Sequence, residues 1–183
     1  MILSGEKIKK EVKKGRIIIS PFENSLLNPN SYNYRLSSTL YEICDSVIDP
    51  KKKTNIKKIV IPENGYVLKP NRLYLGSTIE KIGSPKYVTQ LIGRSSVGRL
   101  GLFLQVTAPL GHVGCEHCWT LELRVVQPLR VYPNMKIGQV SFWRITGNKK
   151  LSYKNGEYNK YIDAEISKFY KDGVYKWFYL EKK

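Results

Sequence analysis

The chain has 183 residues, 42% of them hydrophobic and 25% charged, and a formal net charge of +16. This length and composition predict a single domain, residues 1–183, whose core needs neither a metal ion nor disulfides. No apolar run reaches the roughly 20 residues of a membrane span, and residues 1–7 lack the apolar region of a signal peptide. We therefore expect a cytoplasmic protein with no membrane partner.

The first predicted element is a short helix at residues 4–14. Ser4 can cap it, Ile8 and Val12 are four residues apart and share a face, and Gly15 can end it. The apolar pattern then changes to that of short strands, separated by turns rich in Asn, Pro and Gly. These strands are predicted at residues 16–19, 59–61, 66–68, 73–75, 87–92, 102–106, 119–126 and 137–145. Many short strands of this kind indicate an all-β jelly roll or barrel.

A polar, glycine-bounded segment interrupts the strands at residues 93–101. Arg94, Ser95 and Ser96 follow an apolar strand and precede what can be one helical turn. Free backbone N–H groups at such a turn, together with hydroxyls and a guanidinium, are able to bind phosphate. If the turn is helical, Ser95 and Arg99 lie on one face. Taken alone, the segment is weak evidence for phosphate binding, because a polar turn flanked by glycines is more often an ordinary turn.

The strand predicted at residues 119–126 carries one acidic residue, Glu122. Alternation places Thr120, Glu122 and Arg124 on one face of this strand and its large apolar residues on the other. One interpretation is a solvent-facing glutamate paired with Arg124. The other is a carboxylate in a dry pocket, where its pKa rises and it can transfer protons near neutral pH.

Several motifs in consistent order resemble those of the dCTP deaminases, a family of the trimeric dUTPase superfamily. The matching segments read NPNSY at residues 28–32, GRSSVGRLGL at 93–102, VTA at 106–108, WTLEL at 119–123 and YPNMKIGQ at 132–139. The resemblance covers about residues 1–146. Several motifs at matching spacings identify a family more specifically than any single motif does. It implies a distorted jelly roll, or β-clip, of the dUTPase-like type with a short N-terminal helix. It also implies a homotrimer with active sites shared between subunits.

The resemblance implies hydrolytic deamination of dCTP to dUTP without a catalytic zinc ion, and some members also cleave dUTP to dUMP. Glu122 would activate the water that attacks C4 of cytosine, and Ser95 and Arg99 would orient that water and Glu122. The residues implied in substrate binding are Arg94 and Ser96 at the phosphates, Thr107 and Ala108 at the pyrimidine edge, and Gln139 in the late turn motif. Magnesium would be carried by the triphosphate.

The sequence departs from the family pattern at two places. His112 stands where the family usually has an Asp near the sugar, which replaces an anion by a neutral or cationic ring. In the C-terminal lid segment, residues 149–183, the family's Lys-Tyr pair and Gln are best matched by Glu157-Tyr158 and Tyr161. Tyr158 is therefore the candidate lid residue, and Lys154 or Lys160 can supply the missing positive charge.

Three other features each have an ordinary alternative. Cys44, Cys115 and Cys118 agree with a reducing compartment, and the CEHC run at residues 115–118 has the wrong spacing for the usual zinc sites. Lysine runs at residues 7–14 and 51–58 attract phosphate or nucleic acid, but we favour solvated faces because no nucleic-acid motif accompanies them. The aromatic and lysine-rich residues 168–183 suit docking on the protein better than a free surface.

Three functions remain open from the sequence. The first is a dCTP deaminase. The second is a dUTP diphosphatase, or an enzyme with both activities, against which the loss of an acidic residue at His112 counts. The third is a catalytically degenerate member that binds a nucleotide or nucleic acid, which the charge and the altered lid favour.

Overall fold

The computed structural model describes residues 1–104, 108–147, 153 and 162–171. Its helices are α1 (Gly5–Lys13), the 3-10 helix η1 (Asn24–Leu26) and the short α2 (Ser95–Gly98). Its strands are β1 (Ile18–Ser20), β2 (Tyr32–Arg35), β3 (Thr39–Ile43), β4 (Ile56–Val60), β5 (Tyr66–Leu68), β6 (Tyr74–Gly83), β7 (Val88–Gly93), β8 (Leu102–Leu104), β9 (Leu110–Gly111), β10 (Glu116–Val125), β11 (Leu129–Val131) and β12 (Lys136–Trp143). The fold is all-β with few helices, as the sequence predicts.

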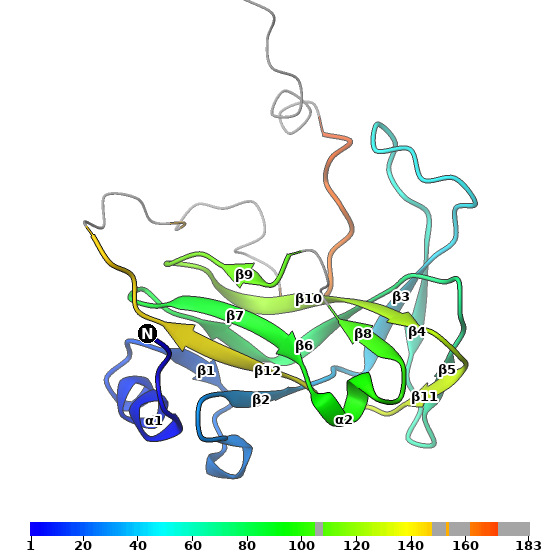
Figure 1. Cartoon of the computed structure of the whole chain (residues 1–183). Helices are drawn as coiled ribbons and strands as arrows, with labels where there is room; N and C mark the ends of the chain where they lie inside the picture. The colour runs from blue at the N-terminus through cyan, green and yellow to red at the C-terminus, as the bar shows by residue number, and fades with distance from the viewer. Residues whose placement is uncertain (105–107, 148–152, 154–161, 172–183) are drawn as a thin grey trace, which may run out of the picture.

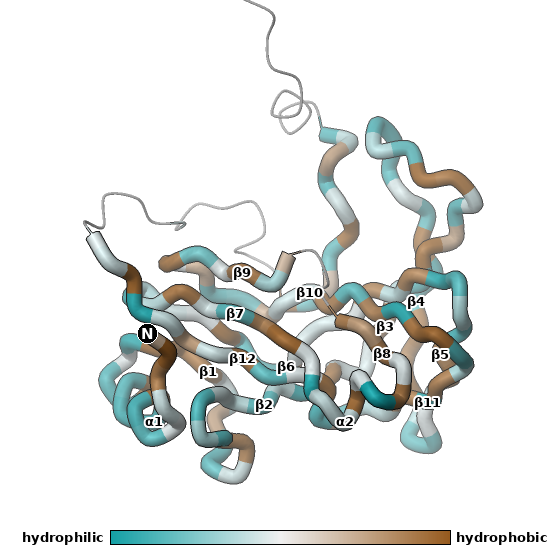
Figure 2. Tube along the Cα trace, in the orientation of Figure 1, coloured by the Kyte–Doolittle hydropathy of each residue, from teal (hydrophilic) through white to brown (hydrophobic). Residues whose placement is uncertain are grey.

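Two antiparallel sheets and a two-stranded ribbon make up the body of the protein (Figure 1). The larger sheet has the strand order β4-β3-β6-β10-β8, with β1 also paired to β6, and the smaller has the order β2-β12-β7-β9. Strands β5 and β11 form the ribbon. Figure 2 shows hydrophobic segments within β7 and β8. None of the helices in the described part of the chain has the length and apolar character needed to span a bilayer.

The strand predictions differ from the structure over much of β6 and at four further strands. The predicted strand at residues 73–75 covers only the start of β6, which runs from Tyr74 to Gly83. Ser77, Thr78 and Glu80 of β6 are almost fully buried, so the burial of this strand does not follow the polar–apolar alternation of its sequence. Strands β2, β3, β9 and β11 are not predicted either. Tyr32–Arg35 is buried or half-buried throughout, a pattern with no period of two.

Helix α1 is anchored by a buried carboxylate. Ser4 caps the helix, as predicted, and Ile8 is fully buried. Glu11, also fully buried, accepts two hydrogen bonds from the guanidinium of Arg16 at 2.6 and 2.7 Å and one from the hydroxyl of Tyr87 at 2.9 Å. The hydrogen bonds from Arg16 outweigh the effect of burial and lower the pKa of Glu11 from its usual 4.5 to about 2.

We expect Glu11→Ala to lower the free energy of unfolding by about 2 kcal/mol, because the buried Tyr87 hydroxyl loses its charged acceptor. Since the pKa of Glu11 is lowered in the folded state, its contribution is complete above the unfolded value and is lost as the pH falls toward 2. Urea unfolding at neutral pH and at pH values below 4 measures both effects. Glu6→Ala, at an exposed position of the same helix, serves as the control and should change stability by less than about 0.5 kcal/mol.

Candidate active site

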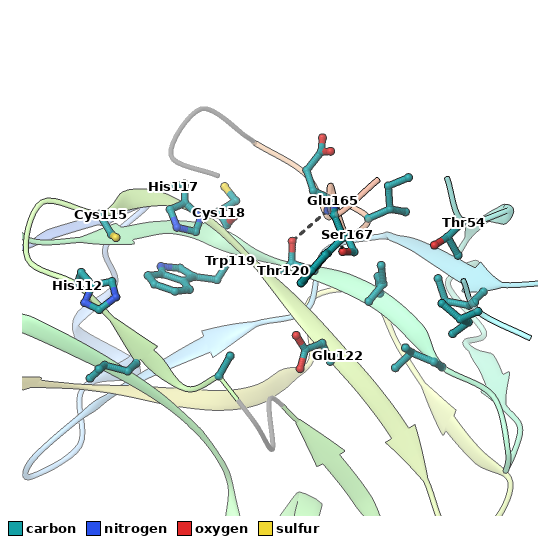
Figure 3. Close-up of a pocket in the computed structure, with 18 of the residues that line it drawn as sticks. Thr54, His112, Cys115, His117, Cys118, Trp119, Thr120, Glu122, Glu165 and Ser167 are labelled. Carbon is teal, nitrogen blue, oxygen red and sulfur yellow. Dashed lines mark hydrogen bonds between the residues drawn. The ribbon is translucent and has the colours of Figure 1, made fainter. Parts of the chain in front are cut away.

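A cavity of about 710 Å³ lies against strand β10. Strand β10 supplies Trp119, Thr120 and Glu122 to its wall, and the segment around β9 supplies Ala108, Leu110 and His112. Residues from β3, β6 and the β3–β4 hairpin line the other end, and residues 165–167 and 169 form a further wall. Figure 3 shows the cavity with His112 and Thr54 at opposite ends and Glu122 between them.

Glu122 is the acidic group of β10 within this cavity. The burial of β10 alternates along the strand, so Thr120 and Glu122 share the half-buried face while Leu121 and Leu123 are in the core. Within the described part of the chain Glu122 has no hydrogen-bond or ion-pair partner, and Arg124 is exposed. Burial raises the pKa of Glu122. Glu122 is therefore a half-buried carboxylate with a raised pKa, and not a surface pair to Arg124.

The wall at the β9 end is aromatic and sulfur-containing. The His112 ring lies 5.5 Å from the Tyr153 ring, and the His117 ring lies 4.3 Å from that of Trp119. Burial lowers the pKa of His117 and raises the pKa of Cys115 to about 11, so both groups are neutral at physiological pH. Among the described residues, no three or more His, Cys, Asp or Glu side chains lie together in a way that could hold a metal ion.

The phosphate-binding candidates lie elsewhere. Residues Ser95–Gly98 form one helical turn, α2, with Arg94 at its N-cap, which confirms the predicted turn. Ser95, Ser96 and Arg99 are exposed, and none of them lines the cavity that holds Glu122. One guanidinium nitrogen of Arg94, Nη1, is buried without a hydrogen-bond partner in the described structure. A single chain therefore does not bring α2 into the wall of the Glu122 cavity.

The remaining candidates separate into three groups. Ala108 and His112 line the cavity with Glu122, whereas Thr107 and Tyr158 lie outside the described residues. Gln139 does not line it: its side chain accepts a hydrogen bond from Ser31 at 2.6 Å and donates one to the carbonyl of Gly93 at 3.2 Å. In the described structure the Gln139 side chain thus links Gly93, which lies just before α2, to Ser31, which lies just before β2.

Two parts of the cavity wall carry no recognisable signal in the sequence. One is the apolar end formed by Ile43, Leu73 and Leu75, and the other is the chain from Glu165 to Phe169. The apolar residues resemble any core positions in the sequence. The C-terminal segment has no strand or helix period, so no local signal indicates that it packs over β10.

Comparisons with known proteins identify clear relatives. A family model described as dCTP deaminase-like matches residues 2–145. The chain is 47% identical over 172 residues to a protein of Hathewaya histolytica named "dCTP deaminase, dUMP-forming", covering 94% of this chain and 99% of that protein. Proteins with the same name from Clostridium acetobutylicum and Cytophaga hutchinsonii are 44% and 46% identical, over 95% and 94% of this chain and 99% and 98% of theirs.

A solved structure agrees with the fold. The crystal structure of 2'-deoxycytidine 5'-triphosphate deaminase from Agrobacterium tumefaciens superposes with a TM-score of 0.63 at 20% identity. The match covers 79% of this chain and 48% of that chain, so this chain spans about half the length of the solved protein. At this identity the likeness shows the fold alone.

Proposed function

Because the chain belongs to the dCTP deaminase-like family, we propose that it is a hydrolytic deaminase of dCTP whose final product is dUMP. The relatives are named for dUMP formation, so dUMP replaces the dUTP that the sequence resemblance implied. The balanced reaction consumes dCTP and two waters and yields dUMP, ammonia and pyrophosphate. The observation that carries the proposal is the unpaired, half-buried Glu122 in a cavity of nucleotide size.

Glu122 performs the deamination step in this proposal. Its carboxylate takes a proton from a water while the water oxygen bonds to C4 of the cytosine ring and the electrons of the C4–N3 double bond move onto N3. The same proton then passes to the exocyclic amine, the bond from C4 to that amine breaks as the C4–N3 double bond re-forms, and ammonia leaves. Transfer of the remaining hydroxyl proton to N3 gives the uracil ring. A carboxylate with a raised pKa suits both halves of the step, because it holds a proton more readily than an ordinary glutamate and can then return it. In this proposal Ala108 and His112, which line the same cavity, contact the base and the sugar.

We infer that Ser95 and Arg99 reach this cavity from a neighbouring subunit of a homotrimer. They are exposed and do not line the cavity of their own chain. The surface around α2 and β8 also carries exposed apolar side chains, with Leu100 at 52%, Phe103 at 49% and Val126 at 67% exposure, and such patches favour subunit contact. From the neighbour, Ser95 and Arg99 orient the water, and Arg94 and Ser96 bind phosphate oxygens.

Magnesium enters the proposal as part of the substrate. Mg²⁺ keeps several waters and is commonly held by substrate phosphates together with few protein ligands. The side chains proposed to contact the phosphates are arginine and serine, which bind anionic oxygens directly and are not magnesium ligands of choice. The metal thus lowers the charge of the triphosphate that these side chains receive.

Incubation with dCTP and magnesium is expected to release ammonia, pyrophosphate and dUMP in equal amounts, without accumulation of dUTP. Ion-exchange chromatography of the nucleotides and an enzymatic assay for ammonia measure this outcome. Accumulation of dUTP would show that the chain only deaminates. A folded protein that leaves dCTP unchanged would contradict the proposed function.

A further inference from the structure

The segment 162–171, named here the C-terminal strap (orange in Figure 1), meets three neighbouring strands of the larger sheet through residues 163–165 and then continues away from the sheet. Its residues contact β3, β6 and β10, which are adjacent in the sheet order. From Glu165 to Phe169 it also forms one wall of the cavity that contains Glu122. The strap is therefore part of the surroundings of Glu122 although it comes from the far end of the chain.

Asp163 anchors the strap to the sheet. Its carboxylate accepts a hydrogen bond from the Tyr41 hydroxyl at 2.9 Å and one from the Ser77 hydroxyl at 3.2 Å. It also accepts one from the backbone N–H of Ala164 at 2.7 Å, which turns the chain toward the sheet. Ser77 lies directly opposite Thr120 in the pairing of β6 with β10. The anchor is thus next to the strand that carries Glu122.

Two further contacts continue the strap toward the cavity. The backbone N–H of Glu165 donates to the Thr120 hydroxyl at 3.0 Å (dashed in Figure 3), and Ala164 is buried in a small cluster with Ile43 and Leu75. In Figure 3 the carboxylates of Glu165 and Glu122 lie on opposite sides of Thr120. The strap consequently contacts the residue that shares a face with Glu122, two positions away on β10.

We propose that Asp163 is a positioning residue of the deaminase: it holds the strap in the wall of the cavity and so keeps Glu122 partly shielded from water. This inference rests on the proposed function. The titratable groups that face Asp163 are Tyr41 from β3, Cys118 from β10 and Glu165 of the strap itself. Within the described residues Asp163 forms no ion pair, so neutral donors hold its carboxylate.

The physical consequence concerns the environment of Glu122. Burial is the cause of its raised pKa, and the strap forms one wall of the cavity in which Glu122 lies. Release of the strap admits water, which favours the ionised carboxylate and brings the pKa back toward its ordinary value. A released strap also leaves the substrate less well positioned, at a typical cost of about 10- to 100-fold in rate.

The test uses the full chain with Asp163→Ala, Asp163→Asn and Tyr41→Phe, and measures kcat and KM for dCTP across pH. Asp163→Ala is expected to lower kcat/KM by about 10- to 100-fold and to move the acidic limb of the kcat profile to lower pH. Asp163→Asn should restore a large part of the activity, because its amide can still accept one hydrogen bond and donate another to a hydroxyl. Tyr41→Phe removes one of the three bonds and should have a smaller effect. Glu63→Gln, at an exposed turn, is the charge-matched control and should leave both parameters unchanged.

Hydrogen exchange at the amides of Ala164 and Glu165, measured without nucleotide, separates this inference from the proposed function. Asp163→Ala should accelerate their exchange about tenfold or more, since charged hydrogen bonds are lost. Unchanged exchange, or an unchanged acidic limb in a folded Asp163→Ala variant, would overturn the role of Asp163. A wild-type chain with slow exchange at these amides but no turnover of dCTP would instead contradict the proposed function, and the catalytic part of this inference with it.

Discussion

Glu122→Gln is expected to lower kcat for deamination by about 10²- to 10⁴-fold, the range that a positioned general base contributes. Glutamine has nearly the same shape as glutamate but cannot accept the proton of the attacking water. Affinity for dCTP should change little, because the carboxylate acts on the water and the reacting amine rather than on the phosphates. Single-turnover measurement of ammonia release, together with calorimetric titration of dCTP, distinguishes the two quantities.

The pH profile of the unsubstituted protein follows from the same carboxylate. In the proposed mechanism the deprotonated form of Glu122 is the active base, and burial raises the pKa of this group. Turnover should therefore fall as the pH drops through a value above that of an ordinary glutamate, and Glu122→Gln should lose this limb. Because burial disfavours the charged form in the folded state, Glu122→Gln should be at least as stable at neutral pH as the parent chain. Thermal unfolding verifies that lost activity is not lost structure.

A matched control lies on the same strand. Glu116 of β10 pairs with Lys81 at 2.7 Å and does not line the cavity. Glu116→Gln removes the same charge from the same strand and should leave kcat unchanged. Equal losses in the two variants would show that charge on β10, and not the chemistry of Glu122, determines the rate.

Mixing two inactive variants is expected to restore activity if the sites are shared between subunits. One variant carries Glu122→Gln and the other carries both Ser95→Ala and Arg99→Ala. In a closed ring of randomly mixed subunits, about a quarter of the sites combine an intact Glu122 with an intact Ser95 and Arg99 from the neighbour. We therefore expect about a quarter of the parent activity per subunit after joint refolding, against almost none for either variant alone.

The geometry of the single chain is the reason for this expectation. Glu122 lines the cavity, whereas Ser95 and Arg99 are exposed on α2 and do not. No restoration in mixed oligomers, verified by light scattering and differential tags, would place a complete site within one chain. That result would also remove α2 from the proposed mechanism, while leaving the role of Glu122 untouched.

Local patterns account for much of what the sequence predicted correctly. The alternation of side chains between the two faces of β10 follows from the sequence of that strand itself. It places Glu122 on the face opposite Leu121 and Leu123 before any partner strand is known. The cap at Ser4 and the helical turn after Arg94 are likewise set by neighbouring residues. The family resemblance depends on motifs of the same short range. These features fixed the fold class and the candidate base.

Only the tertiary structure decided which segments surround that base. Asp163 meets Tyr41 and Ser77 across 122 and 86 residues, and the side chain of Gln139 bonds to Ser31 across 108 residues instead of entering the cavity. Contacts of this range depend on strand register and on where a long connection returns to the sheet, and neither leaves a periodic trace in the sequence. The candidate carboxylate was therefore readable locally, whereas the strap in the wall of its cavity, and the absence of α2 from that wall, were not.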